Sequence, residues 1–457
     1  MSMKSTKHLA GVAVFATAAL ALSACAPGPS ESESGDAGDQ AEPAEVITDI
    51  SGVEDQTLVV WDQEVRGGQN EQMERLNEAF MEKYPNITIE RNSQSFEDLQ
   101  TTLRLALSGE DAPDVVEANN ARSMMGQFVS SGQIIALDDW AEAYGWYDRY
   151  AEDILAYSSY SEDATTFGEG SLYGLPQVGE VVGVFYAPSR LEELGLDVPQ
   201  TWEDFDGQLG TIKDAGETPL MLGNVEKWPA FHLFGAVQGA HVPADEVRTL
   251  GFGNAGASWK TDENLAAATQ LQDWAKAGYF NEGFNGVDYD TVWQDFAQGE
   301  GVYLIAGSWL AADLIEVMGE DVRFIAPPTA DAIGVPSTTG GTGLPFSITS
   351  SAKDPNVAAA YIDFVTSDEA MQILAETGNV PVNKAADFTD EAEGVVADVL
   401  TVFTDVSENG NVLPYLDYAT PTFDQVLGDS LQELLAGNIT PDEFLDQLEA
   451  NYSEFAN

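Results

Sequence analysis

Apolar residues alternate along the chain between short continuous runs and positions three or four residues apart, which predict strands and helices in turn. In the first third of the chain, residues 57–61, 87–89 and 114–116 are predicted strands. Two predicted helices separate them, and their apolar faces carry Met73, Leu76, Phe80 and Tyr84 and then Leu99, Leu103, Ala106 and Leu107. This β-α-β-α-β order favours a parallel sheet with right-handed crossovers and helices on both faces.

The same alternation continues beyond residue 180 and extends the prediction to the rest of the chain. Further strands are predicted at 181–186, 302–306 and 346–348. Helices are predicted at 202–215, 228–238, 265–277, 356–366 and 423–435, with one more beginning near Trp309. No segment of roughly 20–50 residues repeats, which argues against a solenoid or a propeller. We therefore expect an α/β fold with two large lobes or up to three domains.

The loops after the first and third predicted strands hold the first candidate binding residues. In an open parallel sheet, ligands bind beyond the carboxyl ends of the strands. Glu64 and Arg66 follow the first strand, and Asn119 and Asn120 follow the third. Each has a structural alternative: a solvated loop acid for Glu64, an ion pair for Arg66, and an Asx turn for the two asparagines.

Charge excludes several partners that the fold alone would allow. The chain has 18 Lys and Arg against 77 Asp and Glu, a formal net charge of −59. Nucleic acids and anionic membrane surfaces would repel it, because proteins bind phosphates through Lys and Arg. Hydrophobic residues make up 44% of the chain, which is enough to build large cores. The single cysteine excludes disulfides and Cys-based metal sites within one chain.

The cysteine lies at the end of a predicted export signal. Residues 1–24 carry Lys4 and Lys7 near their start and continue as an apolar run too short to span a bilayer comfortably. The run ends in Leu22-Ser23-Ala24-Cys25, which resembles the lipobox of bacterial lipoproteins, where the cysteine receives a lipid. A buried free cysteine after an uncleaved anchor is the alternative. We expect residues 25–56 to comprise the lipidated Cys25 and a disordered acidic tether.

Several short motifs, taken in their order along the chain, resemble those of the family 1 extracellular solute-binding proteins. These are sugar-capturing lipoproteins of ABC importers, related to maltose-binding protein. The motifs are the lipobox, Tyr84-Pro85-Asn86-Ile87, Ala112-Pro113-Asp114-Val115, Tyr173-Gly174-Leu175-Pro176, Phe185-Tyr186, Ala306-Gly307-Ser308-Trp309, Gly340-Gly341 and Asn379-Val380-Pro381-Val382-Asn383.

The resemblance implies a periplasmic-binding-protein-like fold, in which two α/β lobes enclose a ligand cleft and the chain crosses between them several times. The first lobe would hold residues 57–182 and 346–385, and the second 183–345 and 387–457. Such a protein is not an enzyme and needs no cofactor. It would be a monomer, lipid-anchored at the extracellular face of the bacterial cytoplasmic membrane, and would deliver a sugar, expected to be an oligosaccharide, to the membrane subunits of an importer.

A sugar site needs aromatic planes for the C–H faces of the sugar ring, and three aromatic residues are candidates. The resemblance implies a sugar-stacking aromatic at Trp309, which follows a buried strand. It also implies an aromatic near the ligand in the region of Tyr415. Trp228 has a similar setting at the start of a predicted helix. Packing in the core is the alternative, and it is the reading we favour for Trp61, Trp140, Trp202, Trp274 and Trp293.

Polar groups must meet the sugar hydroxyls. Glu180, just before the strand where the lobes are expected to be close, offers a carboxylate for charge-assisted hydrogen bonds, or is a surface charge. Gly341 would let the backbone approach a ligand closely, or simply makes a turn.

A surface glycoside hydrolase is the main alternative among enzymes. It would need two carboxylates across a cleft, and Asp62 with Glu64 or Asp288 with Asp290 are candidate pairs. With 77 acids, however, a pair is easy to propose anywhere. No G-x-x-x-x-G-K-[ST] motif is present, so ATP hydrolysis must belong to a partner.

A second alternative is a binding protein for a cationic solute, such as a polyamine. Acids and tryptophans attract cations through charge and cation–π interactions. Acids that converge on one pocket would favour it, whereas polar groups along a longer groove would favour a sugar. His232 and His241 lack any further ligand pattern, which argues against a zinc site or a His-based triad.

Overall fold

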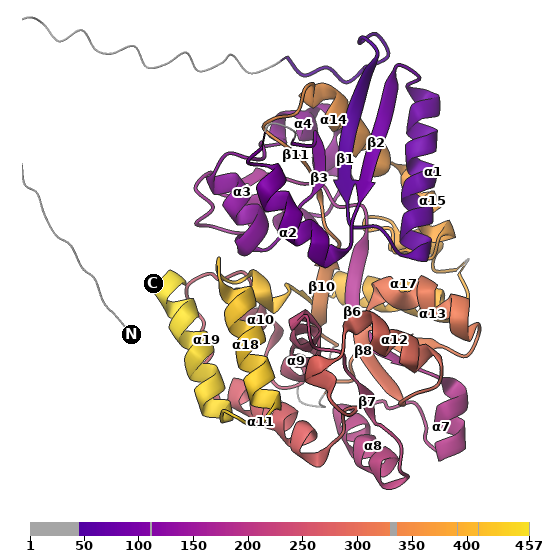
Figure 1. The fold of residues 1–457 in the computed structure, drawn as a ribbon, viewed down its shortest axis with the longest axis vertical. Helices are drawn as coiled ribbons and strands as arrows, with labels where there is room; N and C mark the ends of the chain where they lie inside the picture. Colours follow the sequence, from indigo (N-terminus) through magenta and orange to yellow (C-terminus); the bar gives the residue numbers. More distant parts are fainter. Residues whose placement is uncertain (1–44, 110–111, 330–335, 391, 410, 457) are drawn as a thin grey trace, which may run out of the picture. The chain divides into compact units, whose positions relative to one another are not determined.

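In a computed structural model of the chain, the predicted β-α-β-α-β unit is present (Figure 1). It comprises β1 (Gln56–Asp62), α1 (Gly67–Lys83), β2 (Ile87–Ser93), α2 (Phe96–Ala106) and β3 (Val115–Glu117). β1 pairs in parallel with β2 and with β3, and β11 (Phe346–Ile348) adds antiparallel to β3. The resulting order, β11-β3-β1-β2, brings a late segment of the chain into the first sheet.

The structure describes residues 45–109, 112–329, 336–390, 392–409 and 411–456. The predicted export signal and Cys25 lie outside these residues. The expected tether extends to residue 56, and from Val46 onward the chain belongs to one compact unit. Within it, the Ile50 side chain is fully buried and the Asn86 side-chain amide donates to the Ile50 carbonyl at 3.0 Å. Residues 46–56 therefore pack onto the body.

The helices of the first sheet form where apolar spacing and end signals agree. In α1, Met73, Leu76 and Phe80 are buried, and the Phe80 ring lies 5.3 Å from that of Tyr361 in α14 (Pro355–Val365). The Ser95 hydroxyl caps α2 by accepting a hydrogen bond from the Asp98 amide at 3.2 Å. α14 and α15 (Asp368–Glu376) pack with α1, so late helices complete the layer that the early sequence begins.

A second, mixed sheet is centred on β6 (Gly179–Tyr186), all eight residues of which are buried. Its order is β12-β10-β6-β8-β7, and β9 also pairs with β6. β6 runs antiparallel to β8, β9 and β10. The bounds of these strands are β7 (Leu220–Met221), β8 (Tyr303–Gly307), β9 (Arg323–Ile325), β10 (Thr338–Thr342) and β12 (Val412–Leu413).

Helices surround the second sheet, and α18 and α19 lie side by side (Figure 1). The predicted helices here agree with the structure to within a few residues, and α11 starts three residues early because Thr261 caps it. They are α8 (Trp202–Asp214), α9 (Trp228–Gly239), α11 (Asp262–Ala277), α13 (Ala311–Met318) and α18 (Phe423–Leu435). Helices without a prediction include α7 (Pro188–Leu194), α10 (Ala244–Gly251), α12 (Tyr289–Ala297), α16 (Ala385–Phe388), α17 (Gly394–Glu408) and α19 (Pro441–Ala456).

A layer of short elements links β3 to β6. It holds a π-helical turn (Arg122–Gly126), α3 (Gln127–Ser130), α4 (Asp138–Tyr144), α5 (Trp146–Arg149), α6 (Glu152–Ala156), β4 (Ser159–Tyr160) and β5 (Ser171–Leu172). Arg122 is buried in this layer, where it donates to the carbonyl oxygens of Ala164, Thr165 and Phe252. No described helix is both long and apolar enough to cross a membrane.

Three segments of the chain pass side by side between the elements of the two sheets: residues 175–179, 342–346 and 379–383. Their backbones are joined to one another. Gly343 donates to the Val178 carbonyl at 2.9 Å, and Gly179 donates to the Val380 carbonyl at 2.8 Å. The chain therefore passes more than once between the two sheets.

Candidate ligand-binding pocket

The ends of several strands meet at one pocket with about 670 Å³ of empty space, counting its open mouth. The loop after β1, the loop after β3 and the turn after β8 all contribute to it, as the strand-end rule predicts. Its lining residues are Gln63, Arg66, Gln69, Phe96, Asn119, Glu180, Trp228, Phe231, His232, Trp309, Thr342, Leu344, Tyr415, Asp417 and Tyr418.

Six of the nine predicted binding residues line this pocket: Arg66, Asn119, Glu180, Trp228, Trp309 and Tyr415. For two of them the structural alternative also holds. Arg66 Nη2 donates to Asp290 Oδ1 at 3.1 Å, and Asn119 Oδ1 accepts from the Ala121 amide at 2.8 Å. The pocket thus combines side chains from the elements of both sheets. Some of these side chains lie several hundred residues apart in the sequence.

The other three predicted residues, Glu64, Asn120 and Gly341, are outside the lining set. The Asn120 amide is buried and donates to the Tyr157 carbonyl at 2.6 Å. Gly341 has φ of +122°, and a Cβ there would lie 2.9 Å from the Tyr157 ring. Both residues therefore pack against Tyr157 behind the pocket lining. Close packing against this ring, and not the close approach of a ligand to the backbone, explains the glycine at position 341.

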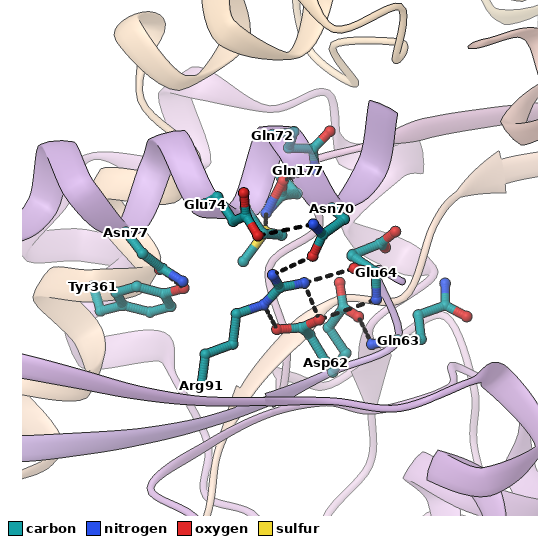
Figure 2. A network of polar contacts seen from close by, with 12 residues as sticks. Asp62, Gln63, Glu64, Asn70, Gln72, Glu74, Asn77, Arg91, Gln177 and Tyr361 are labelled. Carbon is teal, nitrogen blue, oxygen red and sulfur yellow. Dashed lines mark hydrogen bonds and ion pairs between the residues drawn. The ribbon is translucent and has the colours of Figure 1, made fainter. Parts of the chain in front are cut away.

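Glu64 lies in a buried polar network below the loop that follows β1 (Figure 2). Arg91 holds Asp62 through two bonds, from Nε at 2.6 Å and from Nη2 at 2.8 Å, and also donates to the Glu64 carbonyl. Glu117 accepts from the Gln63 amide at 2.8 Å. The carboxyl groups of Asp62, Glu64 and Glu117 thus lie in one buried network, in which Arg91 pairs with Asp62. Burial raises the pKa of Glu64 to about 8, and the charges of Asp62 and Glu180 add to this shift. Burial also raises the pKa of Glu117, with the charges of Glu64 and Asp62 acting in the same direction.

This network determines where the pocket loop lies. Asp62, Glu64 and Arg91 bind the turn from below, so that Gln63 and Arg66 face the pocket above. Glu64 is only 3% exposed, and its Oε2 has no hydrogen-bond partner among the described residues. It therefore acts on the pocket through the backbone rather than by lining it.

Four rings of the pocket, those of Trp228, His232, Trp309 and Tyr415, together with Tyr418 form an aromatic wall. Trp309 lies 5.3 Å from the His232 ring, His232 lies 5.1 Å from Tyr415, and Tyr415 lies 5.6 Å from Tyr418. Trp228 is 6.3 Å from Trp309 at 62°. The rings are linked edge to face, so each holds its neighbour in place.

Both indole N–H groups are used within the protein. Trp309 Nε1 donates to the Tyr289 hydroxyl at 2.8 Å, and Trp228 Nε1 donates to Glu97 Oε1 at 3.0 Å. A ligand therefore meets the ring carbons of these two side chains rather than free donors. The Glu97 bond also connects α2 of the first sheet with α9 of the second.

Gly307 makes room for the Trp309 ring. It ends β8 with ordinary backbone angles, and a Cβ at this position would overlap the six-membered part of the indole. The glycine is thus required for space and not for a positive φ. This explains why the strand ends in Gly307-Ser308 immediately before the tryptophan.

Glu180 projects from β6 and is 7% exposed. Its Oε2 accepts a hydrogen bond from the Tyr415 hydroxyl at 3.1 Å. Burial raises the pKa of Glu180 to about 7, although the bond from Tyr415 and the nearby Arg66 charge act in the opposite direction. At neutral pH this carboxyl group is therefore able both to accept and to donate.

His232 and Asp417 line the pocket although the sequence did not identify them as binding residues. Burial lowers the pKa of His232 to about 3, so its imidazole is neutral, and its Nδ1 has no partner among the described residues. Asp417 is half-buried, and burial together with Asp424 raises its pKa to about 7. His232 lies in α9, which is apolar and almost wholly buried, so its pattern predicts only core.

The carboxylate pairs considered for a hydrolase do not line the pocket. Asp62 is bound by Arg91, and Glu64 faces Glu117. Asp288 caps α12 through the Thr291 amide at 2.8 Å, and Asp290 binds Arg66. Within the described part of the chain, no group of three or more His, Cys, Asp or Glu side chains is placed to hold a metal ion.

Comparison with known proteins gives relatives of similar fold. The Multiple sugar-binding protein of Streptococcus mutans is 23% identical over 323 residues, 68% of this chain and 71% of that protein. The GacH receptor of Streptomyces glaucescens, solved unliganded and with acarbose, has a TM-score of 0.70 at 18% identity, covering 88% of this chain and 98% of that chain. UgpB from Mycobacterium tuberculosis, in complex with glycerophosphocholine, has the same TM-score and coverage at 19% identity.

These structures confirm the predicted fold class. The sequence model described as bacterial extracellular solute-binding protein matches residues 67–372, well over half of the chain. The match also confirms the prediction of a binding protein rather than an enzyme. The chain belongs to the bacterial extracellular solute-binding protein family.

Proposed function

We propose that this protein captures a sugar, expected to be an oligosaccharide, in the pocket and delivers it to an ABC importer. The observation that carries the proposal is that Trp228 and Trp309 line the same pocket as the carboxyl group of Glu180. Indole faces match the C–H faces of a sugar ring, and carboxylates bind hydroxyls through charge-assisted hydrogen bonds. Asn119 and His232 add polar groups to the same pocket.

The names of relatives support a sugar. One relative is a Multiple sugar-binding protein, another structure is a receptor complexed with acarbose, and a third is RafE in complex with raffinose. Two further relatives are named as ABC transporter extracellular-binding proteins of Pyrococcus horikoshii. These names support delivery to the membrane subunits of an importer.

Closure of two lobes is the mechanism we propose. The lobes are residues 57–182 with 346–385, and 183–345 with 387–457, and the three crossing segments act as the hinge. A sugar that contacts both lobes binds the closed state better and so shifts the population toward it. Two contacts already join the lobes beside the pocket: the Arg66–Asp290 ion pair and the hydrogen bond from Trp228 to Glu97.

The protein is proposed to work as a monomer, held at the outer face of the cytoplasmic membrane by a lipid on Cys25. Two or more acyl chains give stable anchoring where a single chain does not. The acidic segment from residue 26 to residue 45, with six carboxylates and no Lys or Arg, would act as the tether. Radiolabelled palmitate incorporation, compared with a Cys25→Ala variant, tests the anchor.

A cationic solute is the second candidate, and one observation favours it. Glu180 and Asp417 both line the pocket, so acids do converge there. Binding of choline or a polyamine, without binding of any sugar, would replace the sugar proposal with this one.

Isothermal calorimetry against xylo-, malto-, fructo- and galacto-oligosaccharides tests the function, with chromatography of each sugar after incubation. We expect binding of one class and recovery of that sugar intact. Release of shorter sugars would overturn the proposal in favour of a hydrolase. Failure of every sugar to bind, amino sugars included, would overturn it as well.

A further inference from the structure

We propose that the sugar carries a protonated amine, which Glu180 and Asp417 hold at the aromatic wall. The inference rests on the proposed function and narrows it from sugars in general to amino sugars. Four features of the pocket support it: its charge balance, the few partners of its carboxyl groups, the use of the indole N–H groups, and the state of His232.

The charge balance of the pocket is negative. Arg66 is the only Lys or Arg among the residues that line it, and its guanidinium already binds Asp290. Glu180 and Asp417 line the same space. Behind the wall, the guanidinium of Arg91 is already bound to Asp62 and adds no free positive charge to the pocket. A neutral ligand leaves this imbalance unchanged, whereas a cation reduces it.

The two lining carboxyl groups have few partners of their own. Within the described residues, Glu180 receives one hydrogen bond from another residue, that from Tyr415, and Asp417 receives none. Glu180 is more than nine-tenths buried, and a buried charge is unfavourable unless it is paired. Burial accordingly raises the pKa of both groups to about 7. An ammonium group would supply the missing charge and up to three donors.

The aromatic wall suits a cation. Because Glu97 and Tyr289 occupy the indole N–H groups of Trp228 and Trp309, these side chains offer carbon rings to the pocket. Indole is the strongest cation–π partner among side chains. Tyr415 and Tyr418 stand beside the two carboxyl groups and extend the same wall.

The state of His232 is the fourth feature that points to a ligand. Its side chain is 8% exposed, lines the pocket, and leaves Nδ1 without a partner among the described residues. A buried polar atom of this kind is normally hydrogen-bonded. Since burial keeps the imidazole neutral, it can bind a sugar hydroxyl without competing with the ammonium group for the acids.

The test uses pairs of sugars that differ only in having an amino group in place of the hydroxyl at carbon 2 of each ring. Glucosamine is compared with glucose, and the deacetylated chitin disaccharide with cellobiose, by calorimetry of the full chain at about pH 6.5. We expect the amino sugar of at least one pair to bind at least ten-fold more tightly than its hydroxyl partner. This preference should fall with added salt. Proton release, measured in two buffers of different ionisation heat, should accompany only the amine, because it lowers the pKa of the two carboxyl groups.

Glu180→Gln and Asp417→Asn test the assigned groups separately. Each should reduce the ratio of amine to hydroxyl affinity at least five-fold, while Glu162→Gln, which changes an exposed acid outside the pocket, should leave it unchanged. Circular dichroism identifies a variant that fails to fold, and the other variant then carries the test.

Equal or tighter binding of the neutral sugars overturns the inference and leaves the proposed function intact. Binding of choline or putrescine, with no sugar bound, overturns both. An amine preference that survives in both variants also overturns the inference, because other groups must then hold the charge.

Discussion

The Tyr415 hydroxyl donates a hydrogen bond to Oε2 of the buried Glu180 at 3.1 Å and so joins two segments 235 residues apart. Tyr415→Phe removes this bond and keeps the ring. We expect about ten-fold weaker ligand binding, since a hydrogen bond to a buried charged group contributes about 1.5 kcal/mol or more. The pH at which Glu180 titrates should also rise, because the bond favours the ionised form. Calorimetry across pH 5–8 measures both effects. Unchanged affinity at every pH would contradict this role.

Gly307→Ala should displace the Trp309 ring, because the new methyl group overlaps the indole. We expect a strong loss of ligand affinity, together with a loss of about 1–3 kcal/mol in the free energy of unfolding from overpacking. Gly207→Ala is the matched control: it lies within α8 with open space around it, so affinity should be kept and stability should rise slightly. The idea fails if the two variants bind equally well.

Asp290→Asn should weaken ligand binding only slightly. The Arg66 and Asp290 side chains are 24% and 60% exposed, so solvent screens the pair and its contribution is about 0–1 kcal/mol. We therefore expect less than about five-fold loss at low salt and none at about 0.5 M NaCl.

Glu376→Gln is the control for this prediction. It breaks the exposed ion pair between Arg75 in α1 and Glu376 in α15, both within the proposed first lobe, and should not change affinity at any salt concentration. Equal effects of Asp290→Asn and Glu376→Gln would show that the Arg66–Asp290 pair does not favour closure.

The free energy of unfolding of the ligand-free protein should fall as pH rises from about 5 to 8. Burial raises the pKa of Glu180 from 4.5 to about 7, so the folded state keeps a proton that the unfolded state loses. The stability from this group is present below pH 4.5 and is lost toward pH 7, by at most about 3 kcal/mol. In Glu180→Gln, the slope of stability against pH should be smaller. Urea unfolding at several pH values measures it, and equal slopes for both proteins would contradict the pKa shift.

The longer buried strands were predictable, because apolar runs and helical spacing are local signals, whereas the order of strands within each sheet was not predicted. β1, β2, β3 and the buried β6 follow directly from them. The antiparallel addition of β11 to the first sheet was not visible in the pattern, since pairing depends on residues more than two hundred positions away.

The strand-end rule located Arg66 and Asn119, but it could not tell which neighbouring side chains turn inward. Glu64 is drawn into the buried network by Asp62 and Arg91, and Asn120 is buried beneath Tyr157. These outcomes depend on partners from other elements. Local sequence therefore identifies the loop and not the orientation of each residue in it.

His232 and Asp417 show a different limit. His232 lies in a helix whose apolar pattern predicts core, and Asp417 is one acid among 77. Only the folded chain brings them beside Glu180 and Trp309. Most of the acids that give the chain its high net charge therefore lie outside the pocket, and only a few line it.

The central claim is that the pocket walled by Trp309 binds a sugar. Calorimetric titration of the best-binding sugar into the wild type, Trp309→Ala and Tyr147→Ala tests it most directly, because Tyr147 is an exposed aromatic outside the pocket. We predict one sugar bound per chain, at least about 30-fold weaker binding in Trp309→Ala, and no change in Tyr147→Ala, with equal folding of all three by circular dichroism. Wild-type affinity in folded Trp309→Ala would contradict the account.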